Sequence, residues 1–165
     1  MRNAIVVIAL LIILGAVNWS IYAKERQLHE GAVVYLELAP VDPRSLMQGD
    51  YMALRFKLAA DIASAHQALE SDSNGFVVVT LDERSVGQFA RLSSSAESAD
   101  GEIAMLYRIR GGTVKLATNA FFFQEGKAKQ FEPARFGQFR VSETGELLLA
   151  SMHDKKLLRL GDRPL

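Results

Sequence analysis

The stretch DPRSLMQGDYMALRF, residues 42–56, decides the fold of this chain, because it joins a dense turn to a strongly patterned strand. Pro43 fixes its own φ angle, and the side chain of Asp42 can accept a hydrogen bond from the backbone just after it. Gly49 can adopt a backbone conformation that is denied to other residues. These residues predict a turn that directs the chain into the strand that follows.

The second half of the stretch predicts a half-buried antiparallel strand over residues 51–57. Apolar and polar residues alternate in it, as they do when one face of a strand packs on a core and the other meets water. The first face carries Met52, Leu54 and Phe56, and the second carries Tyr51, Ala53, Arg55 and Lys57. We expect the first face to seat this strand in the core.

An apolar segment near the N-terminus, residues 4–23, predicts a helix in the lipid bilayer. It contains no charged side chain, and a helix of this length spans about 30 Å, which is the thickness of a bilayer core. Trp19 and Tyr22 lie near its end, where aromatic rings settle at the membrane interface. The polar residues that follow predict a continuation of the helix that ends at Gly31.

Cleavage of this segment is the alternative to an anchor. A signal peptide would have its hydrophobic region over residues 5–17 and its cleavage site near Ala23. The apolar run is long for such a region, and Ile21 interrupts the small-x-small pattern that cleavage requires. We therefore expect an uncleaved anchor and juxtamembrane helix over residues 1–30, and a separate domain over residues 31–165.

The remainder of the chain predicts many short strands. Residues 75–81 are apolar on both faces, as in a central strand. Gly111 and Gly112 stand between two strand-like segments and predict a two-residue hairpin turn, whereas residues 58–69 are rich in alanine and predict a short helix. The expected fold class is α+β and mainly β. We expect an N-terminal transmembrane helix and then a small curled antiparallel sheet or open barrel with one or two short helices.

Composition narrows the function classes. Lys and Arg together number 19, as do Asp and Glu, so the formal net charge is zero and a basic footprint for nucleic acid is absent. The chain has no cysteine, which excludes disulfides and thiolate chemistry. His29, His66 and His153 are far apart and lack the spacing of metal ligands. We expect no nucleic-acid partner, no metal and no cofactor.

The motif resembles the one that names the GDYXXLXY family of membrane-anchored bacterial proteins. Gly49, Asp50 and Tyr51 are intact, Leu54 is in place, and Phe56 replaces the last tyrosine. The order of a membrane helix, a short strand and the segment PVDPRSL before the motif is similar as well.

The resemblance implies a single-pass protein of the bacterial inner membrane that is often associated with a polytopic membrane protein. A short N-terminal tail before such an anchor usually stays in the cytoplasm, so we expect the domain in the periplasm. No reaction, cofactor or catalytic residue is implied. The leading hypothesis is therefore an accessory or interaction protein without catalysis.

The polar residues of the motif allow a structural and a functional interpretation. Asp42 and Asp50 are suited to hydrogen-bonding the backbone of the turn, with Arg44 as an ion-pair partner. The same residues, together with Tyr51, could instead form a small exposed surface for a partner.

Two further hypotheses concern chemistry. In a membrane-tethered hydrolase, Ser45 would be the nucleophile and Lys57 its base, or Asp42 and Asp50 would share acid–base work. The chain resembles signal peptidases in its anchor and its Gly-Asp pair, but Val41 stands where their pattern places the serine. The last hypothesis is a domain that binds a lipid or an envelope glycan in the mouth of a barrel.

Overall fold

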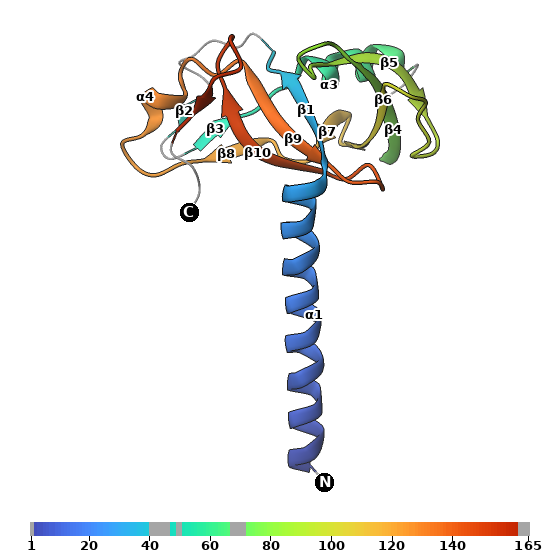
Figure 1. The fold of residues 1–165 in the computed structure, drawn as a ribbon, viewed down its shortest axis with the longest axis vertical. Coiled ribbons are helices and arrows are strands. Elements are labelled where there is room, and N and C mark those ends of the chain that lie inside the picture. The colour runs from blue at the N-terminus through green and yellow to red at the C-terminus, as the bar shows by residue number, and fades with distance from the viewer. Residues whose placement is uncertain (1, 40–46, 49–50, 67–71, 162–165) are drawn as a thin grey trace.

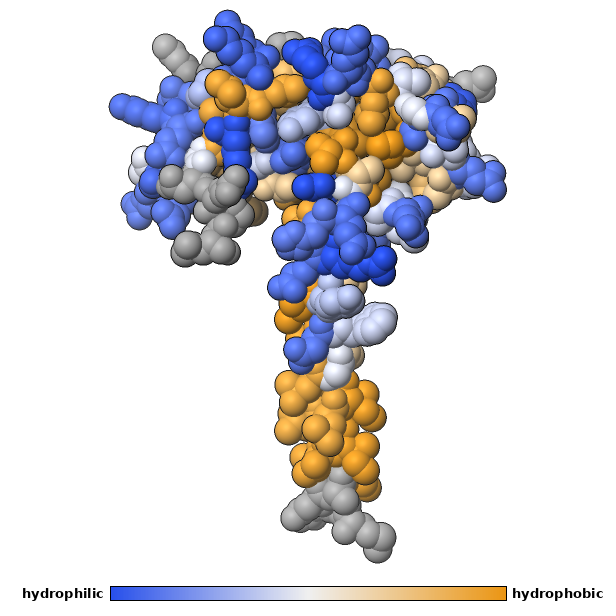
Figure 2. Space-filling view, viewed as in Figure 1, coloured by the Kyte–Doolittle hydropathy of each residue, from blue (hydrophilic) through white to orange (hydrophobic). Residues whose placement is uncertain are grey.

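A long helix carries a β-rich domain at its C-terminal end (Figure 1). The structure is a computed structural model, and it describes residues 2–39, 47–48, 51–66 and 72–161. Helix α1 (Arg2–Glu30) leaves the domain as a single rod. Its apolar side chains from Ile5 onward are exposed on all sides, and they form a continuous hydrophobic surface below a band of hydrophilic residues at the domain (Figure 2). This helix is long and apolar enough to cross a membrane, which suggests a single-pass anchor.

The described strands form three sheets, all with antiparallel pairing. The first has the order β1 (Ala32–Glu37), β9 (Phe136–Val141), β10 (Leu147–His153) and β11 (Arg159–Leu160). The second has the order β5 (Gly87–Ser93), β4 (Ser73–Leu81), β6 (Glu102–Arg110) and β7 (Thr113–Leu116). The third is small and contains β2 (Met47–Gln48), β3 (Tyr51–Ala53) and β8 (Ala120–Phe122). The two described short helices are α3 (Lys57–Ala65) and α4 (Ala128–Phe131).

The two larger sheets are joined by backbone hydrogen bonds and share one core. The amide of Tyr35 on β1 donates to the carbonyl of Ser85, which precedes β5, at 2.9 Å. The amide of Leu106 on β6 donates to the carbonyl of Gly145, in the β9–β10 turn, at 2.8 Å. Helix α3 packs against β1, β5 and β7. Fully buried side chains from both sheets and from α3 meet between them, among them Val34, Leu36, Ile62, Val77, Val79, Met105 and Phe139.

This architecture confirms the expected fold class, an apolar helix followed by a mainly antiparallel, curled β domain with two short helices. The apolar stretch 75–81 lies in β4, which is paired on both sides. Gly111 and Gly112 form the turn between β6 and β7 with φ angles of 55° and 69°, which only glycine adopts readily. The helix predicted over residues 58–69 is confirmed as α3, with bounds one residue earlier at its start and Ala65 as its last residue.

The strand predicted over residues 51–57 is correct in its buried face but wrong in its length. Met52, Leu54 and Phe56 are all buried, as expected. Strand β3, however, ends at Ala53, and Lys57 is the first residue of helix α3. The amide of Leu54 still donates to the carbonyl of Asn119, next to β8, at 2.7 Å, but the carbonyl of Arg55 accepts from the amide of Ala39 at 2.8 Å and Phe56 bridges Leu38. The chain therefore changes partners after Leu54, from β8 to the segment that follows β1.

Candidate functional site

The residues of the opening motif fall into two groups. Those of the turn, Asp42, Arg44, Ser45, Gly49 and Asp50, lie outside the described residues, as does the predicted pairing of their side chains. Tyr51, Leu54, Phe56 and Lys57 are described.

Phe56 is a core residue of the domain. Its side chain is 5 % exposed, and its ring meets the ring of Phe139 edge-on with centroids 5.3 Å apart. The ring also lies over Gly137 on β9, where an added Cβ would come within 3.2 Å of it. The last position of the motif therefore packs β9 against the segment that precedes α3.

Lys57 lies in a setting that does not suit a general base. Its side chain is 62 % exposed and its ammonium is 3.4 Å from a carboxylate oxygen of Glu37. A lysine that serves as a base lies buried away from water and carboxylates, whereas this side chain is solvated and pairs with Glu37. The described half of the Ser45/Lys57 hypothesis thus lacks the environment that the chemistry requires.

Tyr51 and Phe122 form an aromatic pair on the small third sheet. They are direct cross-strand partners on β3 and β8, and their ring centroids are 5.8 Å apart. Phe122 is 75 % exposed, whereas Phe121 and Phe123 pack against the ring of Phe131. Successive side chains of a strand point to opposite faces, so one of the three consecutive phenylalanines faces away from the core and leaves its ring available to a partner.

The junction between α1 and the domain is a network of specific polar contacts. Gln27 on α1 is 8 % exposed, and its side-chain amide donates to the carbonyl oxygens of Arg140 at 3.1 Å and Glu146 at 2.8 Å. The ammonium of Lys24 contacts both the Gln27 side-chain oxygen at 3.2 Å and the Glu146 carboxylate at 2.7 Å. Arg140 in turn donates to the carbonyl of Gly31 at 3.0 Å. These contacts dock the end of α1 on the β9–β10 hairpin.

Gly31 permits this close approach. A Cβ at this position would lie 2.5 Å from the Gln27 carbonyl oxygen, 3.1 Å from the Val141 carbonyl oxygen and 3.2 Å from the Arg140 Cβ. Backbone atoms cannot move aside as the end of a flexible side chain can. The glycine that ends the helix thus also sets the distance between the anchor and the domain.

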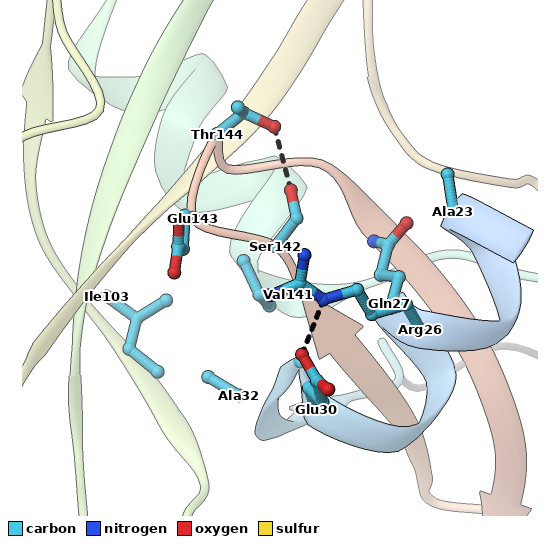
Figure 3. Close-up of a pocket in the computed structure, with 11 residues that line it drawn as sticks. Ala23, Arg26, Gln27, Glu30, Ala32, Ile103, Val141, Ser142, Glu143 and Thr144 are labelled. Atoms are coloured by element: carbon cyan, nitrogen blue, oxygen red, sulfur yellow. Dashed lines mark hydrogen bonds and ion pairs between the residues drawn. The ribbon is translucent and has the colours of Figure 1, made fainter. Parts of the chain in front are cut away.

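A pocket of about 510 Å³ opens at this junction (Figure 3). It lies between the last turns of α1, the β9–β10 turn and β6. Its polar groups come from Arg26, Gln27, Glu30, Ser142, Glu143 and Thr144, and its apolar groups from Ala23, Ala32, Ile103 and Val141. Arg26 donates to Glu30 at 2.6 Å, and the hydroxyls of Ser142 and Thr144 are 2.8 Å apart. The pocket joins an apolar lining to charges of both signs.

Comparison with protein families identifies the chain. The family model described as GDYXXLXY protein matches residues 13–152. The chain belongs to the GDYXXLXY protein family. No curated protein and no solved structure matches it significantly.

The GDYXXLXY match contains both sides of the junction. It begins in the middle of α1 and ends in β10, so it includes residues 24–31 as well as residues 140–146. The docked arrangement of helix and domain therefore lies inside the region that defines the family, together with the motif that names it.

A buried polar chain on β1, β9 and β10 was missed by the sequence analysis of this GDYXXLXY protein. Ser151 lies 2.8 Å from the Gln138 side-chain oxygen and 2.9 Å from His153 Nε2, and Gln138 also contacts the Tyr35 hydroxyl at 3.1 Å. His153 Nδ1 lies 2.9 Å from the Leu157 carbonyl. The Leu157 carbonyl oxygen only accepts, so His153 donates to it through Nδ1. The Ser151 hydroxyl has one proton, and it donates that proton to the Gln138 side-chain oxygen.

The serine–histidine pair resembles a nucleophile and its base in distance alone. Ser151 and His153 are 3 % and 5 % exposed, so a substrate has no access to the hydroxyl. The hydrogen bonds among these side chains instead satisfy polar groups in the interior of the domain, as buried polar side chains require. In the sequence, this group of side chains is indicated by the spacing of Ser151 and His153, which places both on one face of a strand. No group of three or more metal-ligating side chains occurs within the described residues.

Proposed function

We propose that this GDYXXLXY protein is a membrane-anchored interaction protein. In this proposal α1 crosses the bacterial inner membrane once, the domain lies on the periplasmic side, and the domain binds a polytopic membrane protein without catalysing a reaction. The exposed apolar surface of α1 and the family match support the anchor. The polytopic partner is what the resemblance to the GDYXXLXY family implies.

The observation that carries the proposal is the docking of α1 on the β9–β10 hairpin through the side chain of Gln27. A domain on a flexible linker would sample every orientation above the bilayer. The contacts of Gln27 and Lys24 instead hold the domain in one orientation relative to α1, which leaves the domain from one side (Figure 1). In this proposal that side faces the membrane. A fixed orientation and a fixed height reduce the entropy lost when a membrane-embedded partner binds.

The aromatic pair of Tyr51 and Phe122 is the surface we assign to this partner. Strands β3 and β8 lie in the lower part of the domain, on the side from which α1 leaves (Figure 1). Aromatic side chains are enriched in the energetically dominant parts of protein interfaces. The proposal adds the motif residues Asp42, Arg44 and Asp50, which lie outside the described residues, as candidate contacts of the partner.

Site-specific photo-crosslinking in cells tests this function. A photoreactive amino acid replaces Phe122 in one variant and Leu158 in a control, since Leu158 is similarly exposed but lies in the β10–β11 turn. We expect a crosslink to one polytopic membrane protein from position 122 and none from position 158, and we expect Asp50→Ala to weaken it. Crosslinks that are equal at both positions, or absent from both, would refute the interaction role.

A further inference from the structure

We propose that the pocket between α1 and the β9–β10 turn binds the headgroup of an ethanolamine phospholipid from the bilayer that holds α1. The inference rests on the membrane-anchored part of the proposed function and is independent of any protein partner. Three features of the pocket support it, namely its height above the bilayer core, the arrangement of its lining and its balance of charge.

The height of the pocket matches the headgroup layer. The apolar run of α1 ends at Ala23. Among the residues of α1 that line the pocket, Ala23 is also the one nearest to that apolar run. The lining continues along the helix to Gly31, a rise of about 12 Å at 1.5 Å per residue. Headgroups occupy roughly 5–8 Å on each side of a bilayer core. A lipid beside α1 can therefore enter the lower half of the pocket without leaving the bilayer.

The lining matches the two ends of a headgroup. Arg26 uses its Nε–H on Glu30, and a guanidinium has further N–H donors in a fork that suits a phosphate. Across the open space from Arg26 lies Glu143 (Figure 3). Its carboxylate belongs to an exposed turn and can accept hydrogen bonds from an ammonium group. Ile103 and Val141 provide an apolar wall for the glycerol and upper acyl carbons.

The balance of charge selects among headgroups. The pocket is lined by one cation, Arg26, and two carboxylates, Glu30 and Glu143, so it disfavours a headgroup that is purely anionic. A zwitterionic headgroup places its phosphate at the cation and its amine at the carboxylates. Ethanolamine carries an ammonium with three N–H donors, as a lysine does, whereas the quaternary amine of choline has none. We therefore expect ethanolamine lipid to be preferred over choline lipid, and choline lipid over glycerol lipid.

Native mass spectrometry of the full chain tests the preference. The protein is reconstituted in nanodiscs that contain equal amounts of phosphatidylethanolamine, phosphatidylcholine and phosphatidylglycerol, and the lipids that it retains on release are counted. We expect phosphatidylethanolamine to be enriched several-fold over its share. Glu143→Gln removes one carboxylate from an exposed turn and should abolish most of this enrichment. Glu97→Gln, a matched change in the exposed β5–β6 connection, should retain it.

The outcomes separate this inference from the proposed function. Retained lipids in the proportions of the nanodisc, or an enrichment that Glu143→Gln leaves unchanged, would overturn the inference alone. Failure of the full chain to enter nanodiscs would contradict the anchor, and with it both proposals.

Discussion

The side-chain amide of Gln27 lies 2.8 Å from the carbonyl oxygen of Glu146, and 119 residues of sequence separate the two. One residue belongs to the last turns of a helix that is apolar enough to span a membrane, and the other to a β-hairpin of the domain. The hydrogen bond therefore joins two parts of the protein that the sequence presents as anchor and domain. It docks the end of the anchor on the β9–β10 hairpin of the domain's first sheet.

Replacing Gln27 with leucine should destabilise the domain. Leucine has a similar size but no donor, so the carbonyl oxygens of Arg140 and Glu146 each lose a partner in a partly buried position. The loss of such hydrogen bonds costs about 1–3 kcal/mol. Denaturant unfolding of the full chain in detergent measures the change, and Gln88→Leu on exposed β5 is the control. Equal stability of the two variants would mean that the junction contributes nothing to folding.

Gly31→Ala should destabilise the chain more than Gly15→Ala. An added methyl group at position 31 would overlap the Gln27 carbonyl oxygen, whereas at position 15 it meets nothing within 4 Å. Overpacking of this kind typically costs about 1–3 kcal/mol, and an alanine in an exposed helix is neutral or favourable. Thermal unfolding of both variants in the same detergent distinguishes them. A melting temperature for Gly31→Ala at or above that of the wild type would contradict the close packing.

Phe56→Ala should be far more damaging than Phe122→Ala, although both positions carry a phenylalanine near the motif. Loss of a buried phenylalanine ring costs about 3–5 kcal/mol, and Phe56 packs against Phe139 in the core. Phe122 is mostly exposed, so its removal should change the free energy of unfolding by less than about 0.5 kcal/mol. Denaturant unfolding of both variants measures the two changes. A larger loss of stability for Phe122→Ala than for Phe56→Ala would contradict the core role of Phe56.

Asp82 should make the free energy of unfolding of the domain depend on pH in the acidic range. Hydrogen bonds from the backbone amides of Val86 and Arg84, each 2.8 Å long, hold the pKa of this carboxyl below its usual range, and the Arg84 charge acts in the same direction. Because the folded pKa is the lower one, the ionised group stabilises the fold above the unfolded pKa of about 4. That contribution is lost as the pH falls through the folded pKa.

Comparison with Asp82→Asn isolates this contribution, since asparagine keeps an acceptor oxygen but does not titrate. The difference in free energy of unfolding between wild type and variant should be constant at neutral pH and shrink below about pH 4. Free energies measured by denaturant unfolding across that range provide the test. Parallel curves for the two proteins would show that the turn does not depend on an ionised carboxylate.

The sequence predicted the elements that local pattern controls. Alternation placed Met52, Leu54 and Phe56 in the core, and the pair of glycines after β6 predicted its hairpin. Local pattern could not show that β3 ends at Ala53, because Arg55 and Phe56 turn to Ala39 and Leu38 as partners, and these contacts are not encoded in the local alternation.

The candidate site depends still more on distant contacts. In the sequence, Gln27 is one of several polar residues that follow the apolar part of the helix. Its burial depends on the β9–β10 hairpin, which is distant in sequence. The roles of Asp42 and Asp50 stay predictions, since both lie outside the described residues.

A distance measurement between anchor and domain tests the central claim, that α1 is docked in one orientation. The chain has no cysteine, so Ser20→Cys on α1 and Lys115→Cys on β7 provide two unique sites for spin labels. Electron paramagnetic resonance of the doubly labelled protein in nanodiscs should give one narrow distance distribution, and Gln27→Ala should broaden it. A broad distribution in the unaltered junction, or a narrow one that Gln27→Ala leaves unchanged, would contradict the account.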